Sequence, residues 1–256
     1  MEKSVLNSEE SLSWVRFFRQ APDERVRLFC FPFAGGGASA FLPWKKLLPD
    51  YISLVPVQLP GHEDRFEEKA IMNAERMYEA MYEGLRPYFS STMAFFGHSM
   101  GGLLAFQFAR YMLGRGETVP VHLFLSAAPV PVRPPEMTGE SSEEEEFLRR
   151  ILQSGTVPEA VMLDEESLQI VKKTLLSDHE LLLSMLDGRT DPLVVPVTIM
   201  AGERDRLVPL ERVQEWRNFT SGSCNMLTWP GGHFYVRRWL DDIVKAIDET
   251  LLLYVL

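Results

Sequence analysis

Short runs of consecutive apolar residues recur along the chain, and longer stretches with helical spacing separate them. The runs are continuous rather than alternating, as expected for strands buried on both faces of a parallel sheet. They lie at residues 26–33, 52–59, 93–97, 122–126, 197–201 and 225–229. Helices are predicted at 73–89, 100–113, 209–218 and 238–251. This alternation predicts one α/β domain over residues 1–256, with a mostly parallel central sheet flanked by helices.

One region, residues 133–190, breaks the alternation. It opens on Pro134, Pro135 and Gly139 and then shows only helical patterns, at about 144–153 and 164–186. An acidic run at 143–146 fits a solvated helix start, where negative charge is favourable. We expect this insert to form a helical lid on the sheet.

Composition narrows the class of protein. The chain has 256 residues, 46% hydrophobic and 24% charged, so it can bury a core without disulfides or metal. A net charge of −10 argues against nucleic acid and anionic membranes as partners. No apolar run approaches the roughly 18 residues of a membrane helix, and the N-terminus lacks the apolar core of a signal peptide, so a cytosolic location is expected. The two cysteines exclude a disulfide scaffold, and Cys30, in an apolar run, is expected to be a buried thiol.

The sequence GHSMG at residues 97–101 fits the pattern G-x-S-x-G, with Ser99 at its centre. A short apolar strand precedes it and a helical stretch follows, which is the setting of a nucleophile elbow. Side chains two positions before and after the serine would crowd this sharp turn. The following helix would point its free N–H groups at a developing oxyanion. We therefore predict that Ser99 is a nucleophile rather than a helix cap.

A serine hydroxyl needs a base, and five histidines are available. His98 lies in the elbow and is expected to point away from Ser99 and to orient the turn. His233 follows the last strand and precedes the last helix, so it is the predicted base. The acid should follow a strand between Ser99 and His233, and Asp205, after the run 197–201, is favoured over Glu203. The order Ser, Asp, His matches that of α/β-hydrolases.

The second oxyanion donor is expected in the loop after the first strand, where residues 31–37 read FPFAGGG. Small residues allow the backbone to approach a substrate oxygen closely. We predict that the backbone N–H groups of Ala34 and Met100 form the oxyanion hole. No Lys-Ser/Thr pair follows these glycines, so they are not a phosphate-binding loop.

These motifs together resemble the type II thioesterases that accompany polyketide synthases and nonribosomal peptide synthetases. The resemblance spans about residues 26–250 and rests on FPFAGG (31–36), LPG (59–61), GHSMGG (97–102), GERD (202–205) and GGHF (231–234). It implies hydrolysis of acyl groups from the phosphopantetheine arm of acyl or peptidyl carrier proteins. No cofactor and no metal is implied beyond the arm on the substrate, and a monomer is expected. Many members have His in place of Phe33 and Arg in place of His62, which puts acyl preference, but not the triad, in doubt.

Three alternatives stay open on the sequence. A medium-chain fatty acyl thioesterase has a similar fold, and the motifs do not separate it. An esterase acting on free small molecules is the second, and a catalytically inactive binding protein is the third. In each case the lid would shape the pocket: the apolar set that could line an acyl chamber is Leu168, Val171, Leu175, Leu182 and Met185. Arg133, Arg149 and Arg150 are candidate contacts for an acidic carrier protein, against the plain interpretation of solvated surface.

Overall fold

The structure, a computed structural model, describes residues 13–90, 92–133, 141–155, 157, 159–189 and 191–255. Residues 1–12 lie outside these ranges. So does the start of the insert, with Pro134, Pro135 and Gly139. Six strands form one sheet in the order β2-β1-β3-β4-β5-β6, and every ladder between them is parallel. They are β1 (Val26–Phe31), β2 (Ile52–Pro56), β3 (Met93–His98), β4 (His122–Ser126), β5 (Val197–Gly202) and β6 (Cys224–Trp229). The predicted sheet is confirmed, with strand ends shifted by up to three residues.

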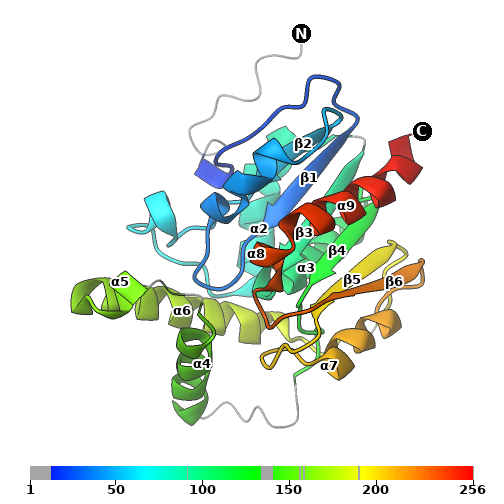
Figure 1. Cartoon of the computed structure of the whole chain (residues 1–256). Helices are drawn as coiled ribbons and strands as arrows, with labels where there is room; N and C mark the ends of the chain where they lie inside the picture. The colour runs from blue at the N-terminus through cyan, green and yellow to red at the C-terminus, as the bar shows by residue number, and fades with distance from the viewer. Residues whose placement is uncertain are drawn as a thin grey trace.

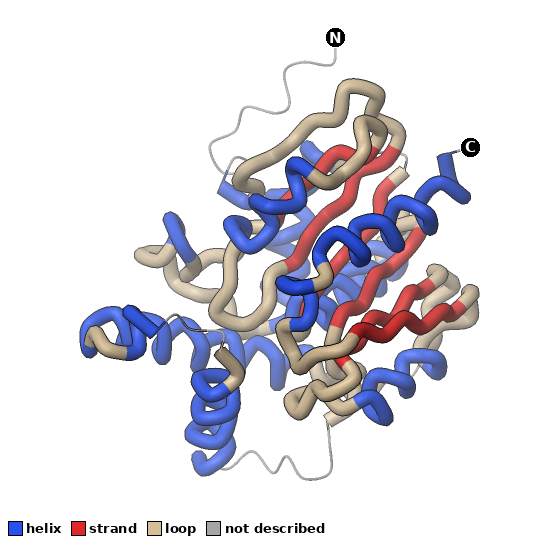
Figure 2. Tube along the Cα trace, in the orientation of Figure 1, coloured by secondary structure: helices blue, strands red, loops and turns tan. Residues whose placement is uncertain are grey.

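Helices cover both faces of the sheet. Figure 1 shows α2 (Ala74–Leu85) and α3 (Met100–Gly114) behind it and α9 (Leu240–Val255) in front, and Figure 2 shows the strands as the layer between. Neighbouring residues of β3 pack on opposite faces of the sheet. Phe95 lies in the hydrophobic cluster that includes α2 and α3, and Phe96 lies in the cluster that includes α9. Both faces are therefore apolar, which explains the continuous runs in the sequence.

Some predicted helices are divided. Residues 73–89 form α2 and the 3-10 turn η3 (Arg86–Tyr88), because Pro87 has no N–H to continue the helix. Residues 209–218 form α7 (Leu210–Gln214) and η4 (Glu215–Asn218). The prediction of one helix at 238–251 is wrong at its start, since Arg238 ends the short α8 (Tyr235–Arg238) and α9 begins at Leu240.

Two 3-10 helices were not predicted. η1 (Ala38–Lys46) packs on the α9 face through Phe41 and Trp44, and η2 (Glu63–Arg65) follows β2. η1 contains Pro43 and has no regular apolar repeat, so its period is not visible in the sequence.

The insert is helical, as predicted, over its described residues. It forms α4 (Ser141–Gln153), α5 (Glu159–Met162) and α6 (Glu165–Met185), which lie together beyond one end of the sheet (Figure 1). Asp164 caps α6 by accepting a hydrogen bond from the Ser167 N–H at 2.9 Å. α6 contacts both α2 and α3, so the lid is attached to the core at this helix.

The first turn of α3 lies against the ends of β1 and β3 with no room for side chains. A Cβ on Gly101 would lie 2.2 Å from the carbonyl oxygen of Phe31 and 2.4 Å from that of Pro32. A Cβ on Gly97 would lie 2.1 Å from the carbonyl oxygen of Gly101. These two glycines therefore allow the close approach that holds Ser99 at the end of β3.

We predict that Gly101→Ala destabilises the protein, because its new methyl group must displace backbone rather than a flexible side chain. Overpacking of this kind costs about 1–3 kcal/mol. Gly114→Ala is the matched control, since it ends the same helix and its Cβ would meet nothing within 4 Å. It should leave stability unchanged or raise it by up to about 1 kcal/mol. Chemical denaturation of both variants measures this, and equal stabilities would contradict the close-approach argument.

Candidate active site

Ser99 lies between the last residue of β3 and the first residue of α3, in a strained backbone conformation. Its φ is 56° and its ψ is −124°, a region that non-glycine residues rarely adopt. Its N–H donates to the carbonyl oxygen of Ser126 at 2.8 Å, and its carbonyl oxygen accepts from the Gly102 N–H at 3.0 Å. Such a conformation costs about 1–3 kcal/mol and persists because the surrounding backbone holds it. The turn leaves the Ser99 side chain half-buried, on the lining of a cavity.

His233 and Asp205 meet from two loops at the same edge of the sheet. Asp205 follows β5, His233 follows β6, and His233 Nδ1 donates to Asp205 Oδ2 at 2.7 Å. The other carboxylate oxygen, Oδ1, accepts from the N–H groups of Leu207 (2.8 Å) and Val208 (3.1 Å). Both oxygens are thereby fixed, and His233 Nε2 is left as the acceptor of the neutral ring. Glu203, the competing carboxylate, is exposed.

Ser99 and His233 line one cavity of about 520 Å³ beneath the lid. Its walls come from the sheet edge, α4, α6 and the loop after β5. The apolar lining residues include Val130, Val132, Phe147, Ile151, Leu182, Leu186, Leu207 and Val208. A largely apolar cavity of this size with few polar groups suits a small-molecule or acyl ligand.

The predicted oxyanion donors, Ala34 and Met100, also line this cavity. Met100 is the first residue of α3, so its N–H has no acceptor within the helix. In the loop after β1, the Gly36 N–H donates to Phe33 O at 2.8 Å and the Gly35 N–H to Asp178 Oδ2 at 2.6 Å. Ala34 N–H donates to none of the residues that the structure describes. The N–H groups of both predicted residues thus have no acceptor among the hydrogen bonds of the described residues, and their role as oxyanion donors stays a prediction.

The lid residues predicted to line an acyl chamber divide between cavity and core. Leu182 lines the cavity. Leu175 and Met185 are fully buried in the core, and Val171 packs against it. Leu168 is half-buried outside both. The lid contributes other lining residues that the sequence analysis did not single out, among them Phe147, Ile151, Asp178, His179 and Leu186.

Asp178 of α6 is hydrogen-bonded to the loop after β1 and forms a buried ion pair with His62, in the loop after β2. Asp178 Oδ2 accepts from the Gly35 N–H and from His62 Nε2 at 3.0 Å, with both side chains 3% exposed. His62 Nδ1 donates to the Pro60 carbonyl oxygen at 3.0 Å, so both ring nitrogens face acceptors. Burial alone would lower the pKa of His62, but the Asp178 carboxylate outweighs it and raises this pKa above 6.5. In the sequence, His62 stood out only as a departure from the arginine of many family members, and Asp178 only as a carboxylate in a helical stretch, so nothing paired the two.

His98 packs behind the elbow, as its position in the motif predicted. Its Nδ1 shares a hydrogen bond with Ser126 Oγ at 2.9 Å, and Ser126 Oγ shares one with Tyr235 Oη at 2.7 Å. Burial, with the nearby His233 and Arg237, holds the pKa of His98 well below its usual range. A neutral ring 5.1 Å from the His233 ring supports that residue without adding charge.

The arginines considered for carrier contact differ in their surroundings. Arg150 lines the cavity and donates to the carbonyl oxygens of Arg206 (3.0 Å) and Leu207 (3.3 Å). Arg149 forms an exposed ion pair with Glu146 at 2.7 Å. Arg133 is exposed. Arg150 and Arg212 of α7 thus lie on the cavity lining, together with the carboxylates of Glu143, Glu146 and Asp178.

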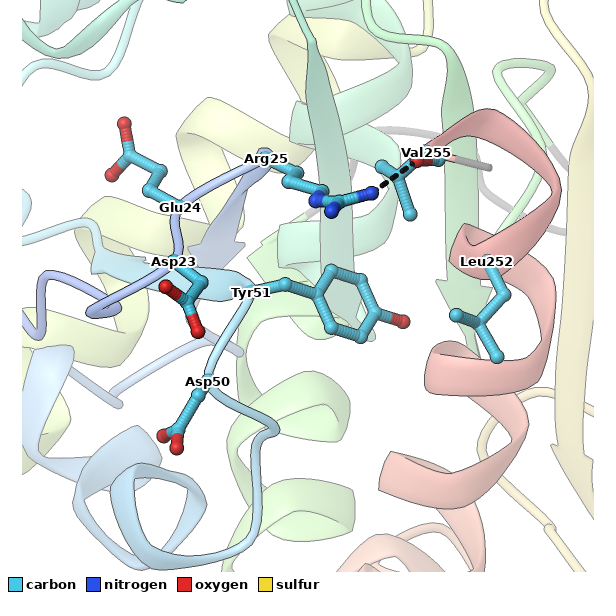
Figure 3. Close-up of a pocket in the computed structure, with 7 residues that line it drawn as sticks. All are labelled: Asp23, Glu24, Arg25, Asp50, Tyr51, Leu252 and Val255. Atoms are coloured by element: carbon cyan, nitrogen blue, oxygen red, sulfur yellow. Dashed lines mark hydrogen bonds between the residues drawn. The ribbon is translucent and has the colours of Figure 1, made fainter.

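A second hollow, of about 710 Å³, lies near the N-terminal ends of β1 and β2, whereas Ser99 lies at the C-terminal end of β3 (Figure 3). Its lining residues come from the segments before these two strands and from the end of α9: Asp23, Glu24, Arg25, Asp50, Tyr51, Leu252 and Val255. Figure 3 shows Arg25 reaching α9, where its Nη1 donates to Val255 O at 2.9 Å. Tyr51 Oη likewise donates to the Asp248 carboxylate. These polar groups fix the C-terminal helix and form no nucleophile–base pair.

The described part of the chain contains no group of three or more His, Cys, Asp or Glu side chains arranged to hold a metal ion. None of its helices combines the length and apolar character needed to cross a membrane. Cys30 is fully buried, as predicted, and burial raises the pKa of its thiol well above the usual range.

Comparison with known proteins agrees with this geometry. A family model described as "Thioesterase domain" matches residues 26–251. The chain is 34% identical to Thioesterase PikA5 of Streptomyces venezuelae, with 98% of this chain and 90% of the relative covered. It is 33% identical to Gramicidin S biosynthesis protein GrsT of Aneurinibacillus migulanus, with 89% of each covered. The solved structure of the type II thioesterase BorB, from the borrelidin biosynthetic cluster, has a TM-score of 0.80 at 29% identity and covers 93% of this chain and 98% of its own.

The parallel sheet with a nucleophile elbow defines an α/β-hydrolase, and within that class the chemistry is that of a serine hydrolase. The chain belongs to the thioesterase domain family and hydrolyses thioesters. The resemblance to type II thioesterases that the five motifs carry is confirmed.

The His62–Asp178 pair predicts a pH-dependent contribution to stability. Because the pKa of His62 is raised on folding, its contribution is fully present below about 6.5, the unfolded value, and is lost as pH rises through the folded pKa. Wild type should therefore exceed His62→Gln in free energy of unfolding by more at pH 5.5 than at pH 9.

His122→Gln is a control for which the opposite dependence of stability on pH is expected. Burial lowers the pKa of His122 to about 4, so the stability of wild type relative to this variant should fall as pH drops below about 6.5. Urea titrations of the three proteins measure both trends. A wild-type advantage over His62→Gln that is the same at both pH values would contradict the ion pair.

Proposed function

We propose that this protein hydrolyses acyl thioesters held on the phosphopantetheine arm of acyl or peptidyl carrier proteins, in polyketide or nonribosomal peptide biosynthesis. Ser99 is the nucleophile, His233 the general base and Asp205 the acid that orients it. One observation carries the proposal: the strained Ser99 and the Asp205-bound His233 line the same acyl-sized cavity. The relatives named for such biosynthesis support the substrate class.

In the acylation step, His233 Nε2 takes the proton from Ser99 Oγ while Oγ forms a bond to the thioester carbonyl carbon. The developing oxyanion is stabilised by the N–H groups of Ala34 and Met100 and by the positive end of α3. The carbon–sulfur bond then breaks, and the thiol of the arm leaves with the proton held by His233. The acyl group remains as an ester on Ser99.

In the second step His233 takes a proton from water as the water oxygen attacks the acyl carbon. The bond from carbon to Ser99 Oγ breaks, Oγ recovers the proton, and the free acid leaves. Asp205 stays ionised throughout and stabilises the imidazolium that forms twice in each cycle. Its second oxygen is already bound by two backbone N–H groups, so the carboxylate keeps its orientation when the ring changes charge.

The cavity surroundings support delivery by a carrier. The arm is long and thin and is attached to a folded protein, so the mouth must stay open to a docked domain. Arg150 and Arg212 line the cavity beside the carboxylates of Glu143, Glu146 and Asp178, and the whole chain has a net charge of −10. Because carrier proteins are usually acidic, recognition then rests on single arginines such as Arg150 and on apolar contact rather than on long-range attraction.

The test is the ratio of kcat/KM values for one acyl group on three carriers. A carrier protein should be preferred over coenzyme A and over the p-nitrophenyl ester. Equal values on the carrier protein and on the small esters would indicate an esterase of free small molecules. A preference that appears only with medium-length chains on a fatty-acid carrier would indicate a medium-chain thioesterase.

We predict that Ser99→Ala lowers kcat by about six orders of magnitude, as for removal of a nucleophile in other triads. Asp205→Asn should cost about 10⁴-fold, because it holds the wrong tautomer of His233. Steady-state hydrolysis of an acyl-carrier substrate measures both. Glu203→Gln, which changes the exposed carboxylate two residues away, is the matched control and should retain full activity. A loss of activity in Glu203→Gln but not in Asp205→Asn would identify Glu203, rather than Asp205, as the acid of the triad.

We also predict that Leu182→Ala, which enlarges the cavity, raises the decanoyl to hexanoyl ratio of kcat/KM about tenfold, the scale of small changes in an apolar pocket. Val171→Ala is the matched control, because Val171 lies on the same helix and also packs against the core but does not line the cavity. The reaction of Ser99 with a small phosphonate should be unaffected in both variants. The same ratio in Leu182→Ala as in wild type would show that the cavity does not hold the acyl chain.

A further inference from the structure

His179 is a buried polar residue in the wall of the Ser99 cavity. It lies on α6, is 1% exposed, and lines the same cavity as Ser99 and His233. Neither of its ring nitrogens has a hydrogen-bond partner among the residues that the structure describes. Its ring stacks on Phe147 of α4, with centroids 4.4 Å apart and planes at 22°, so its plane is fixed by packing.

The ring is kept in its neutral form. Burial lowers the pKa of His179, although the nearby carboxylates of Glu180, Glu144 and Glu143 oppose this shift. A neutral imidazole presents one donor and one acceptor. A buried polar group without a partner is unfavourable, so both nitrogens favour whatever hydrogen-bonding group enters the cavity.

The other charged side chains of the cavity are engaged. Glu146 pairs with Arg149, and Glu143 is not without a partner. Asp178 is bound to His62 and Gly35, and Arg150 donates to two backbone carbonyls. Arg212 pairs with Glu215, which lies outside the cavity lining. His98 also has an unpartnered buried nitrogen among the described residues, but it lies behind the elbow rather than on the cavity wall. His179 therefore lines the proposed acyl cavity and has two unused hydrogen-bonding nitrogens among the described residues.

We propose that His179 is a specificity-determining residue that hydrogen-bonds a hydroxyl group on the acyl chain, so that hydroxyacyl thioesters are preferred over plain alkanoyl thioesters. The inference rests on the proposed function and names the acyl class that the site takes. A plain chain leaves both nitrogens of His179 unpaired. A hydroxyl both donates and accepts, so it satisfies either nitrogen in either tautomer.

Because sites that hydrogen-bond a substrate hydroxyl discriminate against its absence, we expect a preference of about tenfold or more. The experiment compares octanoyl thioesters that are unsubstituted or hydroxylated at C3, C5 or C7. Each is offered to wild type on a carrier protein and on N-acetylcysteamine. At least one hydroxylated chain should exceed the unsubstituted chain in kcat/KM by this factor on both carriers.

Two variants assign the preference to His179. His179→Leu, which removes both polar atoms, should abolish the preference by slowing the hydroxylated chain and not the plain one. His179→Gln keeps a donor and an acceptor and should retain part of the preference. Phosphonate labelling of Ser99 at the wild-type rate shows that each variant retains its folded site.

The outcomes separate the two proposals. No preference for any hydroxylated chain in wild type overturns the role of His179, as does a preference that survives in His179→Leu. Neither result affects thioester hydrolysis itself. Conversely, a hydroxyl preference that holds on N-acetylcysteamine without any advantage of the carrier protein supports the role of His179 and overturns carrier delivery. Absence of hydrolysis of every thioester by wild type would overturn both.

Discussion

The site depends on one backbone constraint, the strained turn at Ser99. A non-glycine residue at φ 56° and ψ −124° is unfavourable by itself and is held because β1, β3 and α3 approach each other too closely to allow another path. Gly97 and Gly101 make that approach possible, and the hydrogen bond from Ser99 to Ser126 joins the turn to β4. Most of the sheet therefore contributes to placing a single hydroxyl group. The same geometry places the N-terminus of α3 beside Ser99, where the proposed mechanism develops negative charge.

The lid is coupled to this centre through α6. Asp178 binds the Gly35 amide next to the proposed oxyanion donor Ala34, and Leu175 packs over Gly35, whose own φ is 75°. A side chain on Gly35 would lie 2.9 Å from Leu175 Cδ2, so the loop and the helix fit only with glycine there. His179 and Leu182, further along α6, line the cavity. One helix thus holds the loop of the proposed oxyanion donor in place and lines the cavity proposed for the acyl chain.

Sequence patterns predicted the sheet, the lid and the nucleophile motif, because each has a local cause. Continuous apolar runs indicate strands buried on both faces. Glycines two positions before and after Ser99 indicate a turn with no room for side chains. The missed features depend on contacts between distant segments. His62 and Asp178 lie 116 positions apart, and no local pattern pairs them. Equally, the helical repeat of α6 could not show that Leu182 lines the cavity while Leu175 and Met185 are fully buried in the core, since all three are apolar positions of one helix.

The most direct test of the account is the rate and site of phosphonylation by a small fluorophosphonate. Peptide mass spectrometry of wild type should find one phosphonyl group, on Ser99. His233→Gln should slow this reaction at least about 100-fold, the lower end of what general-base catalysis contributes. Labelling at another residue, or equal rates in wild type and His233→Gln, would contradict a Ser99 nucleophile activated by His233.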